Sequence, residues 1–153
     1  MTDTKDNARN ELLYVSTTAP STESAARLPA SYTKLGLVSG DTLALSKNMI
    51  DANDKDTGIW TEQIPGRNSG TISVQGNRPK DGNAGQTVVR NAFITDPSPL
   101  VYWLRTDNTV GDLAVHGKGY VESYEEGGDD ETVRSFSTSL SVDGQPTFFV
   151  IQT

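Results

Sequence analysis

The chain has 153 residues, a formal net charge of −7 and no cysteine. A chain of this length forms one domain, and its acidity argues against the basic surface that nucleic acids or anionic membranes require. The lack of cysteine excludes disulfides, zinc–thiolate sites and a cysteine nucleophile. Apolar residues make up only 34% of the chain, which indicates either a thin core or a contribution of partner subunits to stability.

The first ten residues are polar and lack the apolar stretch of a signal peptide. No apolar run approaches the roughly 20 residues that span a bilayer. We therefore expect residues 1–10 to form a flexible N-terminal arm, synthesis in the cytoplasm and no membrane partner.

The first half of the chain predicts short strands over residues 11–16, 35–38, 41–47 and 71–75. Strict alternation of polar and apolar residues is clearest in 41–47 and 71–75. Between them, residues 48–69 read as a long loop, and connections of this length are usually functional or mobile. This loop carries five large apolar residues, which a merely solvated loop would not need: Met49, Ile50, Ile59, Trp60 and Ile64.

The second half predicts one helix over 85–95, because Val89, Ala92 and Phe93 follow helical spacing and Asp96-Pro97 ends the pattern. Strands follow over 100–105, 115–124 and 132–143. The expected fold class is α+β but mainly β, an antiparallel β-sandwich or partial barrel with one flanking helix.

Residues with catalytic or metal-binding potential are sparse. His116 is the single histidine, and no serine lies in a G-x-S-x-G elbow. The spacing after Asp51 departs from a calcium loop, because Lys55 and Asp56 stand where a ligand and a glycine are needed. The acidic run 125–131 could hold a divalent ion, but a solvated hairpin tip is the favoured interpretation. We expect no enzyme, no cofactor and no metal site.

The segment 117–146 carries a family resemblance. It consists of a strand GYVESYE, an acidic turn EGGDDE, a long strand TVRSFSTSLSVDG and then Gln145-Pro146. This pattern resembles the closing hairpin of siphophage major tail proteins, the tail tube subunits of long non-contractile phage tails. The upstream order of elements is also similar, so the resemblance covers most of 11–146, the expected tail tube domain. The hydrophobic tail 147–153 departs from the pattern, and its role stays open.

The resemblance implies a structural subunit. Six copies would form a ring whose inner strands join into a hexameric barrel, and stacked rings would form a hollow tube that conducts DNA into the host. The implied partners are further copies of the chain, a tape-measure protein, initiator (distal tail) and terminator proteins, and passing DNA without specific binding. The implied location is the virion tail, assembled in the host cytoplasm. Two alternatives are a tube protein of a contractile tail or related injection system, and an unrelated ligand-binding β-domain.

A bore that conducts DNA should be polar and free of basic side chains, because Lys or Arg would retain phosphates. The polar faces of three predicted strands meet this requirement, and the turn residue Asp41 would add negative charge. A serine-rich face is also typical of any half-solvated antiparallel sheet. The expected lumen-facing residues are Thr42, Ala44, Ser46, Thr71, Ser73, Gln75, Ser135, Ser137, Ser139 and Ser141.

The opposite faces of these strands should pack beneath the helix. The residues expected there are Leu43, Leu45, Ile72, Val74, Phe136, Leu140 and Val142. In the family the loop that corresponds to 48–69 reaches toward the adjacent ring, so its five apolar residues would be buried on stacking. The alternative is a lid folded over the subunit's own core.

Overall fold

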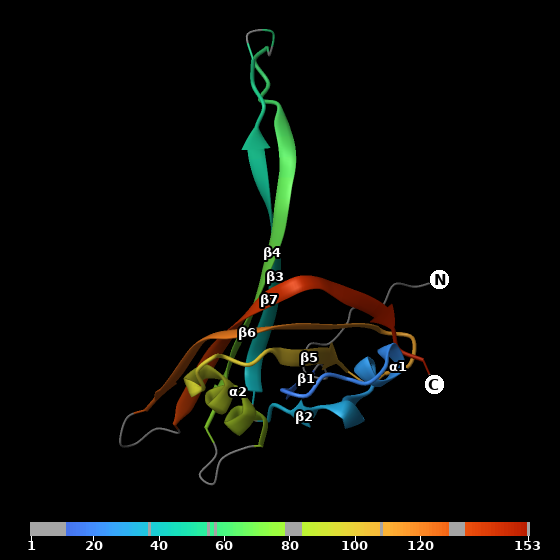
Figure 1. Cartoon of the computed structure of the whole chain (residues 1–153), viewed down its shortest axis with the longest axis vertical. Helices are drawn as coiled ribbons and strands as arrows, with labels where there is room; N and C mark the ends of the chain where they lie inside the picture. Colours follow the sequence, from blue (N-terminus) through green and yellow to red (C-terminus); the bar gives the residue numbers. More distant parts are fainter. Residues whose placement is uncertain are drawn as a thin grey trace.

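The computed structural model describes residues 12–36, 38–54, 56, 58–78, 84–107, 109–128 and 134–152. These residues form one antiparallel sheet of seven strands, in the order β2-β1-β5-β6-β7-β4-β3, with a helix against one face (Figure 1). The strands are β1 (Leu12–Ser16), β2 (Thr33–Lys34), β3 (Val38–Asp51), β4 (Gln63–Asn77), β5 (Val101–Thr106), β6 (Leu113–Gly127) and β7 (Ser135–Val150). The helices are α1 (Glu23–Ala26), the 3-10 turn η2 (Pro29–Ser31) and α2 (Ala84–Ile94). No helix of this described part is long and apolar enough to cross a membrane.

The mainly β class with a flanking helix is confirmed, and α2 lies within one residue of its predicted bounds. The sheet is a single one that curls on itself. Arg105 on β5 donates from Nε to Oδ2 of Asp41 on β3 at 2.7 Å, although β6, β7 and β4 separate the two strands in the sheet. The ion pair therefore joins distant parts of the sheet on its concave side.

The segment expected to be a long loop over 48–69 is mostly strand. β3 continues to Asp51 and β4 starts at Gln63, with Ile50 opposite Ile64. Because β7 pairs with β4 only over residues 71–77, the hairpin beyond that point is a two-stranded ribbon. Figure 1 shows this ribbon projecting from the body. We call residues 45–70 the arm.

The main core lies between the sheet and α2. Val89 and Ala92 of α2 pack with strand residues that include Ile72 and Phe136, as the alternation predicted. Two expected core residues are exposed instead. Leu45 lies on the arm, beyond the part of the sheet that α2 covers, and Phe93 lies in the last turn of the helix, where it is 43% exposed.

The C-terminal segment, whose structure the sequence left open, continues β7 as far as Val150. Phe149 lies opposite Ala114 of β6 and is buried in a second, smaller cluster with Tyr14 and Leu104. The elements around α1 cover this cluster, because Tyr32 packs against it and donates its hydroxyl to the carbonyl oxygen of Ala26.

The start of α2 is held by backbone contacts. The buried Gln86 donates from Nε2 to the carbonyl oxygens of Gly36 and Asn77, each at 3.1 Å. Gly85 lies so close to the carbonyl group of Lys34 that a side chain there would collide with backbone. These contacts fix the helix across the concave face, so the other face of β3, β4 and β7 is left to solvent.

We predict that Gly117→Ala destabilises the fold by about 1–3 kcal/mol, the cost of overpacking a filled core. An added Cβ would lie 2.8 Å from Cζ2 of Trp103, which is fully buried. Urea unfolding measures the loss. The control is Gly58→Ala, where an added Cβ would have no described residue other than its chain neighbours within 4 Å. Equal stability of the two variants would contradict the tight packing of Trp103 on β6.

Candidate functional site: a polar sheet face and a projecting arm

Four neighbouring strands place their polar side chains on one face. Across them, Thr42 of β3 is paired with Ser73 of β4, and Ser73 is paired with Ser139 of β7. The register brings together all ten residues predicted to face a lumen, and each is exposed or half-buried. We call this surface the polar face. Its role in lining a bore stays a prediction.

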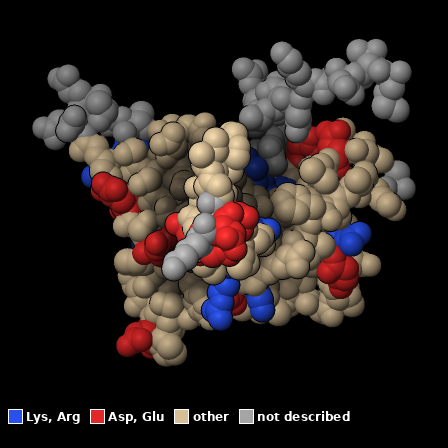
Figure 2. All heavy atoms as spheres, turned by 90° about the horizontal axis from the view of Figure 1, so that it is seen from above, with Lys and Arg blue, Asp and Glu red and all other residues tan. Residues whose placement is uncertain are grey.

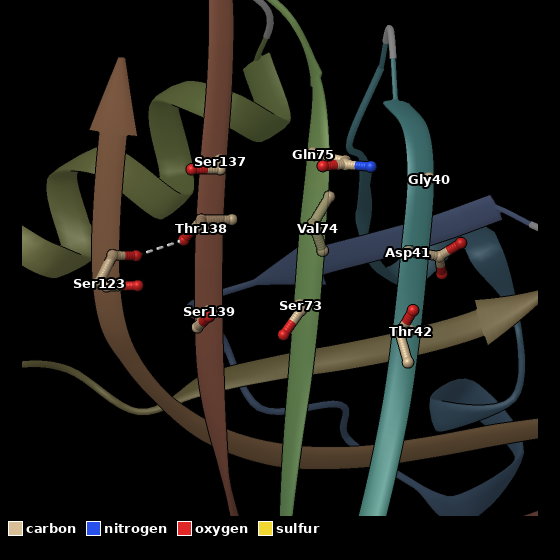
Figure 3. Close-up of a pocket in the computed structure, with 10 residues that line it drawn as sticks. All are labelled: Gly40, Asp41, Thr42, Ser73, Val74, Gln75, Ser123, Ser137, Thr138 and Ser139. Atoms are coloured by element: carbon tan, nitrogen blue, oxygen red, sulfur yellow. Dashed lines mark hydrogen bonds between the residues drawn. The ribbon is translucent and has the colours of Figure 1, made fainter. Parts of the chain in front are cut away.

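The centre of the polar face is a shallow hollow of about 360 Å³. Figure 3 shows Ser73 and Ser139 on neighbouring strands in this hollow, with Thr42 on the next strand. The buried Thr138 is also among the lining residues, and its Oγ1 donates to the carbonyl oxygen of Ser123 at 2.7 Å. The lining contains no Lys, Arg or His, so the hollow has no cationic group that would hold a phosphate.

The strand β6 adds residues that sequence reasoning missed. Tyr120 is paired with Ser141, Ser123 with Ser139, and Glu125 with Ser137. A register shift between Val121 and Ser123 breaks the alternation of β6. From the sequence, the alternation of Ser123 and Glu125 is too short to predict which face of the sheet they occupy. Their pairing with Ser139 and Ser137 of β7 places both on the polar face.

Asp41 does not add a free charge to the polar face. Its register partner Val74 is buried, so the carboxylate lies on the concave side, where it accepts from Arg105. The expectation that Asp41 contributes negative charge to the bore is wrong. The exposed Glu125 supplies a carboxylate on the polar face instead.

One basic residue of β6 lies at the far end of the polar face. Lys118 is paired in register with Asp143 of β7, and both are exposed. The opposite charges on neighbouring strands offset each other. The face is therefore neutral to negative along its length.

His116 has a structural environment. Its Nε2 lies 2.9 Å from Oε1 of Glu23, and its ring packs against Phe149 with centroids 5.7 Å apart. The contact with His116, followed by that with Arg27, lowers the pKa of Glu23 below its ordinary value. These contacts attach α1 to the sheet over the second cluster, which accounts for the single histidine without catalysis.

The acidic run 125–131 is described in part. Glu125 and Glu126 belong to β6, and residues 129–131 lie outside the described residues. Tyr124 donates its hydroxyl to Glu126 at 2.6 Å; burial, followed by this hydrogen bond, raises the pKa of Tyr124 to about 12. Within the described residues no group of three side chains could hold a metal ion.

The arm carries all five apolar residues of the predicted loop, and all are exposed. Ile59 is 96% and Trp60 is 82% accessible to solvent. They are not folded over the subunit's own core, so the lid alternative is wrong. Viewed along the arm, acidic side chains gather around its end (Figure 2), where Asp51, Asp56 and Glu62 are exposed.

Solved structures with the same fold come from tubular assemblies. The chain is similar to a protein in the tail of an empty gene transfer agent particle with C6 symmetry (TM-score 0.72, 15% identity, covering 95% of this chain and 100% of that chain). It is also similar to the SPP1 tail tube protein (TM-score 0.71, 18% identity, 94% and 78%). A third match is a protein of the anti-feeding prophage baseplate (TM-score 0.70, 6% identity, 99% and 100%). The fold is that of tail tube subunits.

The family is established by sequence. A family model described as "Phage tail tube protein" matches residues 7–148, nearly the whole chain. The chain belongs to this family, and it is a structural component of the phage tail rather than an enzyme. No curated protein matches it.

We predict that Asp41→Ala destabilises the fold by about 1–3 kcal/mol, because it leaves a mostly buried guanidinium without its charged partner. Thermal or urea unfolding measures the change. The control is Asp143→Ala, whose exposed cross-strand pair with Lys118 should contribute about 0–1 kcal/mol. Equal small losses in both variants would mean that the Asp41 carboxylate is solvated.

Proposed function

We propose that six copies of this chain form a ring in which the polar faces line a central bore, and that the rings stack into a hollow tube that conducts DNA into the host. The observation that carries this proposal is the polar face itself, together with the two unpaired strand edges that border it. The arm supplies the contact between rings.

The first unpaired edge is the outer side of β3. In the described part of the chain, β3 pairs only with β4. The second is the far half of β6, since β5 pairs with β6 only over Val115–Gly119 and no other described strand pairs with residues 120–127 on that side. Exposed strand edges are templates for pairing with another chain. Pairing β3 of one copy with β6 of the next would extend the polar face around a ring.

The strand directions are compatible with this closure. The polar face consists of β6, β7, β4 and β3, and each neighbouring pair is antiparallel. An even number of alternating strands leaves the first and last strands running in opposite directions. When identical copies are arranged around an axis, the junction between β3 and β6 is then antiparallel like all the others. Closure would remove both edges, as it does in barrels.

The chemistry of the face suits a conduit for DNA. Small hydroxyl side chains offer water a polar wall, and the ten predicted residues include no Lys or Arg. A wall that is neutral to negative does not release counterions from DNA and so does not retain it. DNA would pass without specific binding.

The arm would reach the adjacent ring and bury its apolar residues there. Isolated hydrophobic residues on a surface are normal, but a projecting ribbon that carries five of them indicates an interaction site. Burial of Met49, Ile50, Ile59, Trp60 and Ile64 between rings would hold the stack together.

The wider assembly follows from this role. We propose a tape-measure protein inside the growing tube, initiator (distal tail) and terminator proteins at its ends, and assembly in the host cytoplasm before incorporation into a virion. A non-contractile siphophage tail is the first interpretation. The alternative is the tube of a contractile tail or related injection system, which the fold similarity to the anti-feeding prophage protein supports. A sheath gene next to the tube gene would distinguish the two.

Negative-stain microscopy of the purified protein tests the proposal directly. Rings or tubes with a central hole are expected once the protein is concentrated. Featureless monomers at every concentration, also in the presence of tail initiator complexes, would contradict it.

We predict that the double substitution Ser137→Lys and Ser139→Lys leaves rings and tubes intact but reduces infectivity, because basic side chains in the bore would hold phosphates. Complementation of a phage that lacks its own copy measures the titre, and microscopy checks the tubes. The matched control, Ser137→Asn with Ser139→Asn, adds bulk without charge and should infect normally. Normal infectivity of the Lys variant would refute the lumenal placement.

We predict that Trp60→Asp lowers polymerisation while the monomer still folds, because Trp60 makes no contribution to the core of the subunit. Sedimentation measures polymer and circular dichroism measures folding. Hydrogen exchange on monomer and tube adds a second measurement, in which the backbone around Trp60 should become protected only in the tube. Equal exchange in both states would count against burial of the arm on stacking.

A further inference from the structure

Two exposed patches of complementary character lie at opposite ends of the molecule. The first is the arm tip, residues 51–54, 56 and 58–62, which carries the exposed side chains of Ile59 and Trp60 together with the exposed carboxylates of Asp51, Asp56 and Glu62. The second is on α2, which Figure 1 places at the end of the body away from the arm.

The patch on α2 combines apolar side chains with a cation. Arg90, Phe93 and Ile94 are spaced at i, i+3 and i+4, so they share one face of the helix. Phe93 is 43% and Ile94 is 69% exposed. Within the described residues Arg90 takes part in no ion pair. We call these three residues the α2 patch.

We propose that the arm tip of one copy docks on the α2 patch of a copy in the next ring. This inference rests on the proposed function, the stacking of rings, and names the surface that receives the arm. In a stack of copies along their long axis, the end that carries the arm meets the end that carries α2.

The two surfaces match in chemistry. Ile59 and Trp60 would be covered by Phe93 and Ile94, which removes apolar surface from water on both sides. Arg90 would face the acidic tip, and a guanidinium over an indole ring adds a cation–π attraction. Opposite charges across an interface favour the correct partner and penalise wrong ones.

A second exposed apolar patch is less suited to receive the tip. Leu113, Phe148 and Val150 lie on neighbouring positions of β6 and β7. These three residues are all apolar and offer no cation to the acidic arm tip. A contact there would leave the carboxylates of the tip without a cation, whereas the α2 patch provides Arg90.

The contact is heterologous, because it joins two different surfaces of identical chains. Each copy would give one arm and receive one. The arm tips at one end of the stack and the α2 patches at the other end therefore stay open for the next ring. Such an interface builds an open assembly when the repeat does not close on itself. Growth of the tube by addition of rings follows from this geometry.

Disulfide trapping tests the contact, since the chain contains no cysteine of its own. The test chain carries Ile59→Cys together with Ile94→Cys and is oxidised after polymerisation. We expect a ladder of dimers, trimers and longer species on a non-reducing gel, because a disulfide forms only when the two Cα atoms approach within about 7 Å. Each single-cysteine variant should give no ladder.

The matched control is Ile59→Cys with Phe148→Cys, which directs the same arm residue at the second patch and should stay uncrosslinked. A ladder from this pair, or no ladder from the first pair in samples where microscopy shows tubes, overturns the docking and leaves the tube function standing. If the unsubstituted protein forms no rings or tubes, the proposed function fails as well.

Charge reversal provides an independent test. Arg90→Glu should raise the critical concentration for polymerisation by roughly tenfold, which corresponds to about 1.4 kcal/mol per contact. Arg90→Lys should retain most polymerisation, and adding Asp56→Lys and Glu62→Lys to Arg90→Glu should restore part of it. Urea unfolding checks that each variant folds. Polymerisation of a folded Arg90→Glu variant at the normal concentration would overturn the proposal.

Discussion

Side chains of β4 and β7 alternate between two environments, and the register between the two strands keeps both alternations in phase. Ser73 is paired with Ser139 on the polar face, and Ile72 is paired with Leu140 on the side that α2 covers. A slip of one residue would place serines in the core and aliphatic side chains in water. The core energetics therefore hold the polar face in place, although the serines themselves add little to stability.

The curl of the sheet determines how the unpaired edge of β3 is presented to another subunit. The ion pair between Arg105 and Asp41 holds the outermost strand β3 toward β5 from the concave side. It thereby sets the direction in which the unpaired edge of β3 points. An edge that is fixed in this way loses little conformational entropy when it pairs with another strand, which favours association between preorganised subunits.

Much of the body could be predicted because its patterns are local. The ten polar-face positions follow from alternation, and α2 follows from the spacing of Val89 and Ala92. The arm could not, because Pro65, Gly66 and Gly70 are typical of loops; the structure tolerates them in a ribbon where no third strand needs their backbone groups. The partner of Asp41 also escaped prediction, since the contact depends on how the whole sheet curls.

The distribution of apolar residues separates folding from assembly. The buried apolar residues of the described chain all lie outside the arm, so the body can fold while Ile59 and Trp60 stay in water. Full burial of one large apolar side chain contributes about 1.5–3 kcal/mol. A single arm contact would therefore be weak, because association must first offset the loss of translational and rotational freedom. When a whole ring docks, its translational and rotational freedom is lost once, whereas every arm of the ring forms its contact. Growth on an existing ring is therefore favoured over random association of monomers.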